Sequence, residues 1–234
     1  MLSPRELIEI QVETLFTSDG KRGLRGINDP DGEASPAPRF FFGSTREGSI
    51  CRFRHDLPEN VVARLRKAAE AEPMLLDSRK LPRCHRQFID ILQSQAPIEG
   101  VWAGPAYHFP DRIEPPKDVV RLSPENAGFL KGDFAEMVPE LRNERPRYGA
   151  IEDSQAVSIC QSVRLSPRAH EAGVDTLEAY RRRGYAASAV AAWALAVRAL
   201  NLVPLYSTSW DNEASQGLAR RLGLVQYGVD YYVT

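Results

Sequence analysis

The segment Arg181-Arg182-Arg183-Gly184-Tyr185-Ala186 decides the fold of this 234-residue chain, because it joins two segments of opposite character. Before it, the alternation of side chains in Glu171–Thr176 predicts a short strand. After it, Tyr185–Val197 is apolar on every side and predicts a buried helix. The sequence therefore predicts a turn that leads from a strand into the start of a buried helix.

Three arginines stand at this helix start, although the positive end of a helix dipole repels each exposed cation by about 0.3–1 kcal/mol. A bound anion would reverse that effect, because unpaired backbone N–H groups, a glycine and cationic side chains together form a phosphate-binding turn. The alternative is a solvated loop, since 25 of the 30 basic residues are arginines and Asp175 and Glu178 offset part of the charge. The residues alone leave both interpretations open.

The pattern Arg181-x-x-Gly184-x-Ala186, entered from a strand and followed by a long apolar helix, resembles the acyl-CoA pyrophosphate loop R/Q-x-x-G-x-G/A of the GNAT acetyltransferase superfamily. The order of the later segments also resembles the superfamily. These segments are a strand at Pro204–Ser209, a helix start at Asp211–Ser215 and a helix end at Arg221–Leu224. The resemblance is specific from about Gly149 to Val225 and is absent from the N-terminal half.

The resemblance implies an α+β fold in which a mixed, mostly antiparallel sheet is flanked by helices, the GNAT-like acyl-CoA N-acyltransferase fold. We expect this domain at residues 117–234, after the proline-rich and charged linker Pro110–Asp118. Residues 1–116 then form a smaller N-terminal α+β region of unknown role.

Periodicity and turn residues predict the elements on both sides of this linker. Before it we expect helices that begin at Ser3, Asp56 and Pro82, strands at Arg39–Gly43, Ser49–Phe53 and Gly100–Tyr107, and a long loop at Ser18–Pro38. After it we expect a strand at Val119–Leu122, a helical segment at Ser123–Leu141 broken near Gly132 and Pro139, and a hairpin of Tyr148–Glu152 with Ala156–Val163.

By resemblance, an acyl-CoA molecule would contact three places. The pyrophosphate would bind the turn, the pantetheine arm would pair with the edge of the preceding strand, and the start of the last helix would hold the arm near its thiol. The corresponding residues are Arg181, Arg182, Arg183, Gly184, Tyr185 and Ala186, then Val174, Asp175 and Thr176, then Asn212 and Ser215. Asn212 is equally well explained as a helix N-cap.

Acetyl transfer to an amine favours a general base and a proton donor for the departing thiolate. Glu171 is the candidate base, because members of the superfamily often carry a carboxylate on this strand. The alternative is that Glu171 is a solvated glutamate at the strand edge with no catalytic role. His170 is a weaker candidate for the base. The tyrosine that the superfamily commonly uses as acid is replaced by Ala219. Tyr206, Ser207 or Tyr227 could substitute, or the thiolate could leave unaided, since a thiol pKa of about 8.5 makes it a fair leaving group.

The expected function is therefore transfer of an acetyl group from acetyl-CoA to an amine of an unidentified acceptor, by direct attack of the amine on the thioester. Coenzyme A is expected as the co-substrate. The alternative is a non-catalytic acyl-CoA-binding or sensing module, and a third reading is an interaction protein in which the motif is accidental. No metal is expected, because the four histidines lie apart and Cys51, Cys84 and Cys160 show no paired spacing.

The net charge and the hydropathy of the sequence argue against nucleic-acid and membrane partners. A net charge of −1 argues against nucleic acid, which usually selects a basic surface. The N-terminal residues lack a signal-peptide pattern, and the apolar run Tyr185–Val197 is shorter than the ~20 residues of a spanning helix, so we expect a cytoplasmic protein without membrane partners. The sequence leaves a homodimer and the identity of the acceptor open.

Overall fold

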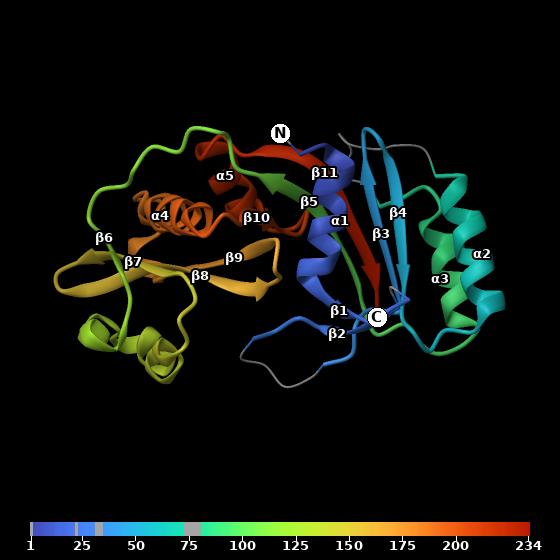
Figure 1. Ribbon diagram of the computed structural model, residues 1–234, viewed down its shortest axis with the longest axis horizontal. Helices are drawn as coiled ribbons and strands as arrows, with labels where there is room; N and C mark the ends of the chain where they lie inside the picture. Colours follow the sequence, from blue (N-terminus) through green and yellow to red (C-terminus); the bar gives the residue numbers. More distant parts are fainter. Residues whose placement is uncertain (1, 22, 31–34, 73–80) are drawn as a thin grey trace. The chain divides into compact units, whose positions relative to one another are not determined.

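The computed structural model describes residues 2–21, 23–30, 35–72 and 81–234 (Figure 1). The chain divides into two compact units. Unit 1 comprises Met1–His108, Ser207–Gln216 and Val225–Thr234, and unit 2 comprises Phe109–Tyr206 and Gly217–Leu224. The last strand thus groups with the N-terminal residues. From the sequence we expected a boundary between residues 116 and 117, with the functional domain after it. This functional division of the chain stays a prediction.

The described residues of unit 1 contain three complete helices and a four-stranded antiparallel sheet in the order β4-β3-β11-β5. Its elements are α1 (Pro4–Leu15), β1 (Phe16–Ser18), β2 (Leu24–Ile27), β3 (Phe40–Thr45), β4 (Gly48–Phe53), α2 (Glu59–Glu70), α3 (His85–Gln93), β5 (Val101–His108) and β11 (Val225–Val233). The predicted helices and strands before the linker are confirmed.

The expected loop at Ser18–Pro38 is wrong in part. β1 and β2 form a small antiparallel sheet in which Phe16 pairs with Ile27 and Thr17 with Gly26. Leu24 is buried and anchors β2, which explains why a segment rich in glycine still contains a strand. Residues 22 and 31–34 of this segment lie outside the described part of the chain.

A capping box begins α1 at Ser3, where the sequence predicted a helix start. The backbone N–H of Glu6 donates to Ser3 Oγ at 3.2 Å, and the backbone N–H of Ser3 donates to Glu6 Oε2 at 2.8 Å. These bonds satisfy two groups that a helix start leaves unpaired. Local contacts therefore stabilise the start of the first helix.

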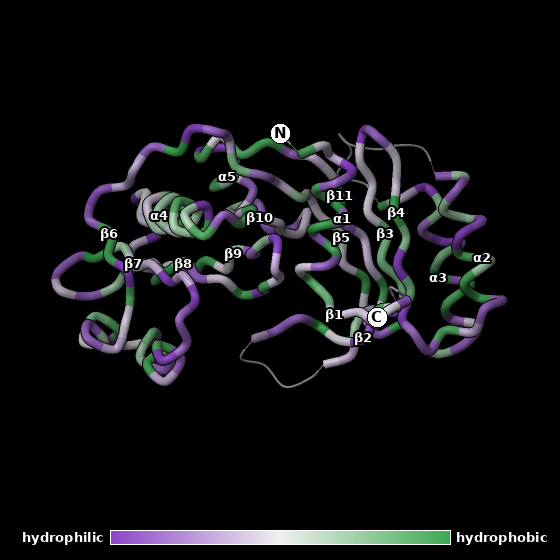
Figure 2. Tube along the Cα trace, viewed as in Figure 1, coloured by the Kyte–Doolittle hydropathy of each residue, from purple (hydrophilic) through white to green (hydrophobic). Residues whose placement is uncertain are grey.

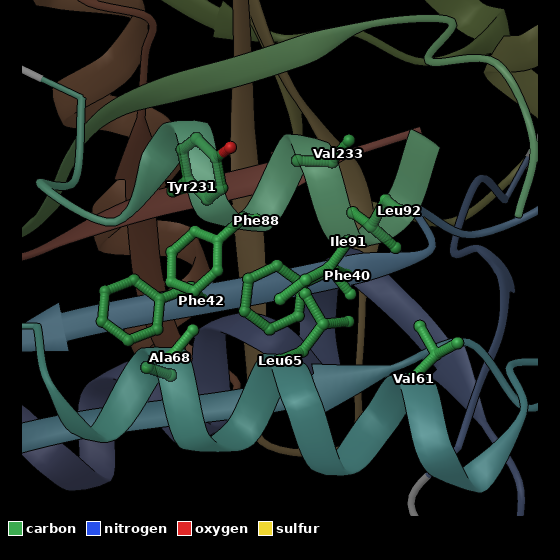
Figure 3. Close-up of a cluster of buried hydrophobic side chains, with 11 residues drawn as sticks. Phe40, Phe42, Val61, Leu65, Ala68, Phe88, Ile91, Leu92, Tyr231 and Val233 are labelled. Atoms are coloured by element: carbon green, nitrogen blue, oxygen red, sulfur yellow. The ribbon is translucent and has the colours of Figure 1, made fainter. Parts of the chain in front are cut away.

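The core of unit 1 lies where α2 and α3 pack on the sheet (Figure 3). Phenylalanines from β3 and α3 are in close contact, with the ring centroids of Phe40 and Phe88 4.9 Å apart and the ring planes tilted by 58°. Burial of side chains of this size stabilises a fold by about 1.5–3 kcal/mol each. The cluster comprises Phe40, Phe42, Val61, Leu65, Ala68, Ala69, Phe88, Ile91, Leu92, Tyr231 and Val233.

Unit 2 has a five-stranded sheet in the order β10-β9-β8-β7-β6. β9 and β10 are parallel and the other described pairs are antiparallel, so the sheet is mixed and mostly antiparallel, as predicted. The elements are β6 (Val119–Arg121), η1 (Pro124–Phe129), η2 (Gly132–Arg142), β7 (Arg147–Glu152), β8 (Gln155–Leu165), β9 (Ala169–Thr176), η3 (Glu178–Tyr180), α4 (Tyr185–Ala199) and β10 (Val203–Ser207). α5 (Glu213–Arg221) has residues in both units.

Two 3-10 helices, η1 and η2, replace the single broken helix that we expected at Ser123–Leu141. The predicted breaks explain the difference, since Gly132 has a left-handed φ of 57° and Pro139 interrupts the hydrogen bonding of an α-helix. Figure 1 shows α4 on one face of β7 and β8 and this yellow-green segment on the other. The fold is therefore α+β with helices on both faces of the unit 2 sheet.

The hairpin of β7 and β8 confirms the strands expected at Tyr148–Val163. Asp153 and Ser154 form its turn with positive φ angles of 49° and 57°. Two successive positive φ angles are typical of a type I′ turn, whose twist matches that of antiparallel strands. The polar residues between the two strands thus mark the turn correctly.

Helix α4 is buried over most of its length, with Ala189, Val190, Ala191, Trp193, Ala194 and Val197 in the core of unit 2. Figure 2 colours most of this helix white to green, the apolar end of its scale. Its first turn is half-buried, and so are Ala192, Leu195 and Ala196 in its middle, so the expectation of burial on every side is wrong. The residues at the start of the helix are therefore less buried than those that pack on the sheet.

The linker residues are tied to the other end of α4. Arg198 donates hydrogen bonds to the carbonyl oxygens of Phe109, Pro110 and Asp111 at 2.7–3.1 Å. The ring of Phe109 is buried, with its centroid 6.0 Å from that of Trp193. The start of the proline-rich segment is therefore anchored by a guanidinium group and an aromatic contact.

A buried polar network connects α4 to the sheet. Trp193 Nε1 donates to Ser162 Oγ at 3.0 Å, and Ser162 Oγ lies 2.9 Å from His170 Nδ1. Because neighbouring residues of a strand face opposite sides, His170 faces α4 and Glu171 faces the other side of the sheet. His170 is thus a structural partner of the helix, which weakens its candidacy as a base.

We expect His170 to make stability depend on pH. Burial lowers the pKa of His170 below 6.5, so the unfolded chain binds this proton more readily than the folded chain does. Stability is therefore retained above about pH 6.5 and decreases as the pH falls toward the lower folded pKa. Urea unfolding should show a smaller decrease between about pH 7 and pH 5 for His170→Asn than for wild type.

His85→Asn is the matched control, since burial also lowers the pKa of His85 and this residue belongs to unit 1. That variant should keep the part of the pH dependence that belongs to His170. A His170→Asn protein with the complete wild-type pH dependence would contradict the assignment.

We also expect Gly173 of β9 to be intolerant of any side chain. A Cβ at this position would overlap Cγ1 of Val163 on the neighbouring strand. Gly173→Ala should lower the free energy of unfolding by about 1–3 kcal/mol, as overpacking usually does. Val163→Ala should restore part of the loss, because the remaining Cβ lies at 3.3 Å. Gly128→Ala is the control, since nothing lies within 4 Å of the Cβ position at Gly128. Equal urea midpoints for Gly173→Ala and Gly128→Ala would refute the prediction.

Candidate functional site

Strands β9 and β10 run parallel for only three residue pairs. The pairs are Ala169 with Val203, His170 with Pro204 and Glu171 with Leu205. In the described part of the chain, the rest of β9 up to Thr176 pairs only with β8. The β10-facing edge of Val174, Asp175 and Thr176 therefore lacks a strand partner among the described residues, because the two strands diverge after Glu171.

Glu171 occupies the last paired position before the strands diverge. It is buried, with 3% of its surface exposed, so the alternative of a solvated strand-edge glutamate does not describe it. Charged side chains are seldom buried without a specific partner or role. Its position at the divergence and its burial make it a reasonable candidate for proton transfer, a role that stays a prediction.

The turn after β9 has the backbone of an anion site. Gly184 is the N-cap of α4 with a left-handed φ of 100°, and no side chain caps the helix. Arg182 also has a positive φ, 61°, which costs a residue with a side chain about 1–3 kcal/mol. The N–H groups of the first turn, including those of Tyr185 and Ala186, have no partner within the helix. Backbone in this conformation concentrates positive charge at one point.

The three arginines of the turn are exposed and differ in their contacts. Arg181 Nε donates to the carbonyl oxygen of Thr176 at 3.4 Å. Arg183 lies over the ring of Tyr180 at 5.3 Å and approaches Glu152 Oε1 at 3.9 Å, both partly exposed, so this ion pair contributes little. Arg182 makes no side-chain hydrogen bond or ion pair with any described residue.

A fourth cation, from the last turn of α5, lies at the same turn. The Nη2 atom of Arg221 is 2.8 Å from the position that a Cβ of Gly184 would occupy. The sequence placed Arg221 only at the end of a helix, and no local pattern links it to Gly184. The sequence signal that could have suggested this contact was a basic residue in the last turn of α5, the helix that follows α4.

Asn212 acts as a helix cap. Its side-chain Oδ1 accepts a hydrogen bond from the backbone N–H of Ser215 at 3.0 Å. This contact supports the capping interpretation, since Asn at this position stabilises a helix by about 1 kcal/mol. Both residues belong to unit 1, and their contact with a pantetheine arm stays a prediction.

A buried alanine occupies the position at which the superfamily commonly has a tyrosine that acts as the general acid. Ala219 is completely buried within α5 and has no group that could donate a proton. Among the proposed substitutes, the Tyr227 hydroxyl already donates to Gln11 Oε1 at 2.9 Å in the interior of unit 1, and Tyr206 is 2% exposed. The usual acid is thus absent from its expected position.

Other chemistry has little support in the described residues. Within residues 2–21, 23–30, 35–72 and 81–234, no three His, Cys, Asp or Glu side chains are grouped so that they could hold a metal ion. Cys160 is completely buried, and burial raises the pKa of its thiol well above the usual value, as expected for a core residue rather than a nucleophile. No helix in these ranges is long and apolar enough to cross a bilayer.

Several solved structures are similar to the chain, all with low sequence identity. An acetyltransferase from the GNAT family of Colwellia psychrerythraea has 10% identity, covers 100% of this chain and 98% of its own, and has a TM-score of 0.48. A GCN5-related N-acetyltransferase-like protein from Streptococcus suis has 14% identity, 85% coverage of both chains and a TM-score of 0.47. A GNAT-family protein from Novosphingobium aromaticivorans has 17% identity and a TM-score of 0.46, with 58% of this chain and 66% of that chain covered.

With TM-scores below 0.5, these likenesses carry no inference about activity. A search of curated proteins found no match. The family comparison is more specific and concerns the part of the chain that carries the turn, the divergent strands and α5. Residues 146–231 match the family model described as GNAT acetyltransferase, so the C-terminal part of the chain resembles this family, as the sequence indicated.

Proposed function

We propose that the protein is an acyltransferase that moves an acetyl group from acetyl-CoA to an amine. The observation that carries the proposal is the start of α4, where Gly184 has a left-handed φ and no side chain caps the helix. The match of residues 146–231 to the GNAT acetyltransferase family supports the same assignment. Residues 117–234 would be the acetyltransferase domain.

The diphosphate of CoA would bind the backbone N–H groups of Arg182–Ala186. Its negative charge is complementary to the helix dipole and to the exposed guanidinium groups of Arg181, Arg182 and Arg183. The residues present fit such a group, because Gly184 has no side chain to obstruct its approach. Binding would also offset the repulsion among these arginines.

The pantetheine arm would add to the open edge of β9 at Val174, Asp175 and Thr176. An extended amide chain can bond to an unpaired strand edge in the way that an added peptide strand does. Asn212 and Ser215 would contact the arm near its thiol. We expect the thioester of the bound molecule to lie near the end of the β9–β10 pairing, which is the position of Glu171.

In the transfer step, the amine nitrogen forms a bond to the thioester carbonyl carbon, and the bond between that carbon and sulfur breaks. Glu171 takes the proton from the amine, directly or through a water molecule, and CoA leaves as the thiolate. Because Ala219 has no hydroxyl group, the thiolate leaves without a tyrosine donor and takes a proton from water. A thiolate with a pKa of about 8.5 is stable enough to leave in this way.

Ala219 also favours a second function, which is binding of acyl-CoA without catalysis. A chain that keeps the CoA turn but lacks the usual acid could bind acyl-CoA without transferring the acyl group. Labelled acetyl-CoA offered with small amines, amino acids and peptides that carry a free N-terminus or lysine separates the two functions. Transfer to any of these supports the enzyme, and CoA binding without transfer supports the binding module. Absence of CoA binding in calorimetry would contradict both.

We expect Gly184→Val to weaken CoA binding by well over tenfold, which is about 1.4 kcal/mol or more. The φ of 100° is unfavourable for a β-branched residue, and the new side chain would enter the space that the diphosphate approaches. Calorimetric titration with CoA provides the measurement. Gly132→Val is the control, because Gly132 also has a positive φ, 57°, but lies on η2. An unchanged dissociation constant for Gly184→Val would count heavily against the site.

We expect Glu171→Gln to reduce the acetylation rate about 10²–10⁴-fold and to alter its pH profile, since an amide cannot accept the proton of the amine. Affinity for acetyl-CoA should stay near that of wild type. Glu178→Gln is the control for loss of one negative charge, because Glu178 is exposed on η3. A wild-type pH profile for Glu171→Gln would remove this residue from the mechanism.

A further inference from the structure

We propose that Arg221 is a further binding residue of the acyl-CoA site and contacts the diphosphate with its guanidinium group. This inference rests on the proposed function. It adds a ligand contact from α5, an element separate in sequence from the turn at Arg181–Ala186. It also assigns the contact to one phosphate group of CoA and not to the other.

The position of the guanidinium group is the first argument. Atoms Nη2, Cζ and Nη1 of Arg221 lie 2.8, 3.4 and 3.6 Å from the place where a Cβ of Gly184 would be. The group therefore covers the glycine that begins α4, directly at the positive end of that helix. A cation is held there against the helix dipole, at a cost of about 0.3–1 kcal/mol, and a bound anion would turn this cost into an attraction.

Comparison with the neighbouring Arg220 shows that attraction to the negative end of the α5 dipole does not explain where the Arg221 guanidinium group lies. Both arginines lie in the last turn of α5, where the negative end of the helix dipole favours cations equally. Arg220 extends along its own helix, and its Nη2 lies 3.7 Å from the Cβ position of Gly217. The three heavy atoms nearest to the Cβ position of Gly184 all belong to Arg221, so the two arginines of this helix end point to different glycines.

The charge of Arg221 is available to a ligand. Within the described residues, neither Arg221 nor Arg182 of the facing turn forms a hydrogen bond or an ion pair. Arg221 is also exposed, so its side chain can move to accommodate an anion at low cost. A guanidinium group binds phosphate oxygens through two parallel N–H bonds, which is a stronger contact than a single ammonium group provides.

The diphosphate is the expected contact, because it is the group proposed to bind the N–H groups after Gly184. The 3′-phosphate of CoA is attached to the ribose and would lie farther along the molecule. Dephospho-CoA lacks the 3′-phosphate and keeps the diphosphate. The two ligands therefore distinguish which phosphate Arg221 binds.

The experiment is calorimetric titration of wild type, Arg221→Gln, Arg220→Gln and Arg221→Lys with CoA and with dephospho-CoA. We expect Arg221→Gln to weaken binding of both ligands about tenfold, the size of one charge-assisted contact. Arg220→Gln should leave both affinities within about twofold of wild type. Arg221→Lys should recover part of the loss, because it keeps the charge without the paired N–H bonds.

The outcomes separate this inference from the proposed function. If wild type binds CoA and Arg221→Gln resembles Arg220→Gln with both ligands, the role of Arg221 is wrong and the proposed function stands. Weaker binding of CoA alone would assign Arg221 to the 3′-phosphate and overturn the inference as stated. If wild type binds neither ligand, both proposals fail. Thermal unfolding of the free variants, expected to match wild type, verifies that the folds are intact.

Discussion

Packing of α4 against β8 and β9 is the constraint on which the arrangement of unit 2 depends. Trp193 is completely buried and bonds to Ser162, so the helix has one fixed position on the sheet. Once the helix is fixed, its first residue is fixed as well. The chain must then turn sharply to reach this point from β9, and Gly184 adopts the left-handed backbone that the turn requires. A rigid, buried helix thus presents its N–H groups at a defined place.

Strand β9 connects this helix start to the candidate base. Its first three residues pair with β10 on one side, and the remainder pairs only with β8 in the described part of the chain. The same strand therefore holds a buried carboxylate at the end of the pairing and an open edge after it. His170 and Glu171 face opposite sides of the sheet, so His170 contacts the network that holds α4, whereas Glu171 is directed away from it. The alternation of a strand thus separates the structural histidine from the proposed base.

The sequence predicted the features that depend on nearby residues. The capping box at Ser3, the turn at Asp153 and Ser154, and the apolar run of α4 are each encoded within a few positions. It missed strand β11, whose partners β3 and β5 lie more than 100 residues earlier in the sequence. It also missed the approach of Arg221 to Gly184, which depends on how α4 and α5 fold together. Contacts between distant segments leave no local pattern that spacing could reveal.

The place of β11 between β3 and β5 has a consequence for biosynthesis. A ribosome releases the segments of unit 2 before it releases Val225–Val233, yet β11 is an inner strand of the unit 1 sheet. Until that strand emerges, β3 and β5 lack their common neighbour and keep unpaired backbone edges, which are prone to aggregate. Unit 1 would therefore complete its sheet after translation of unit 2, and nascent chains would depend on rapid closure or on chaperones during that interval.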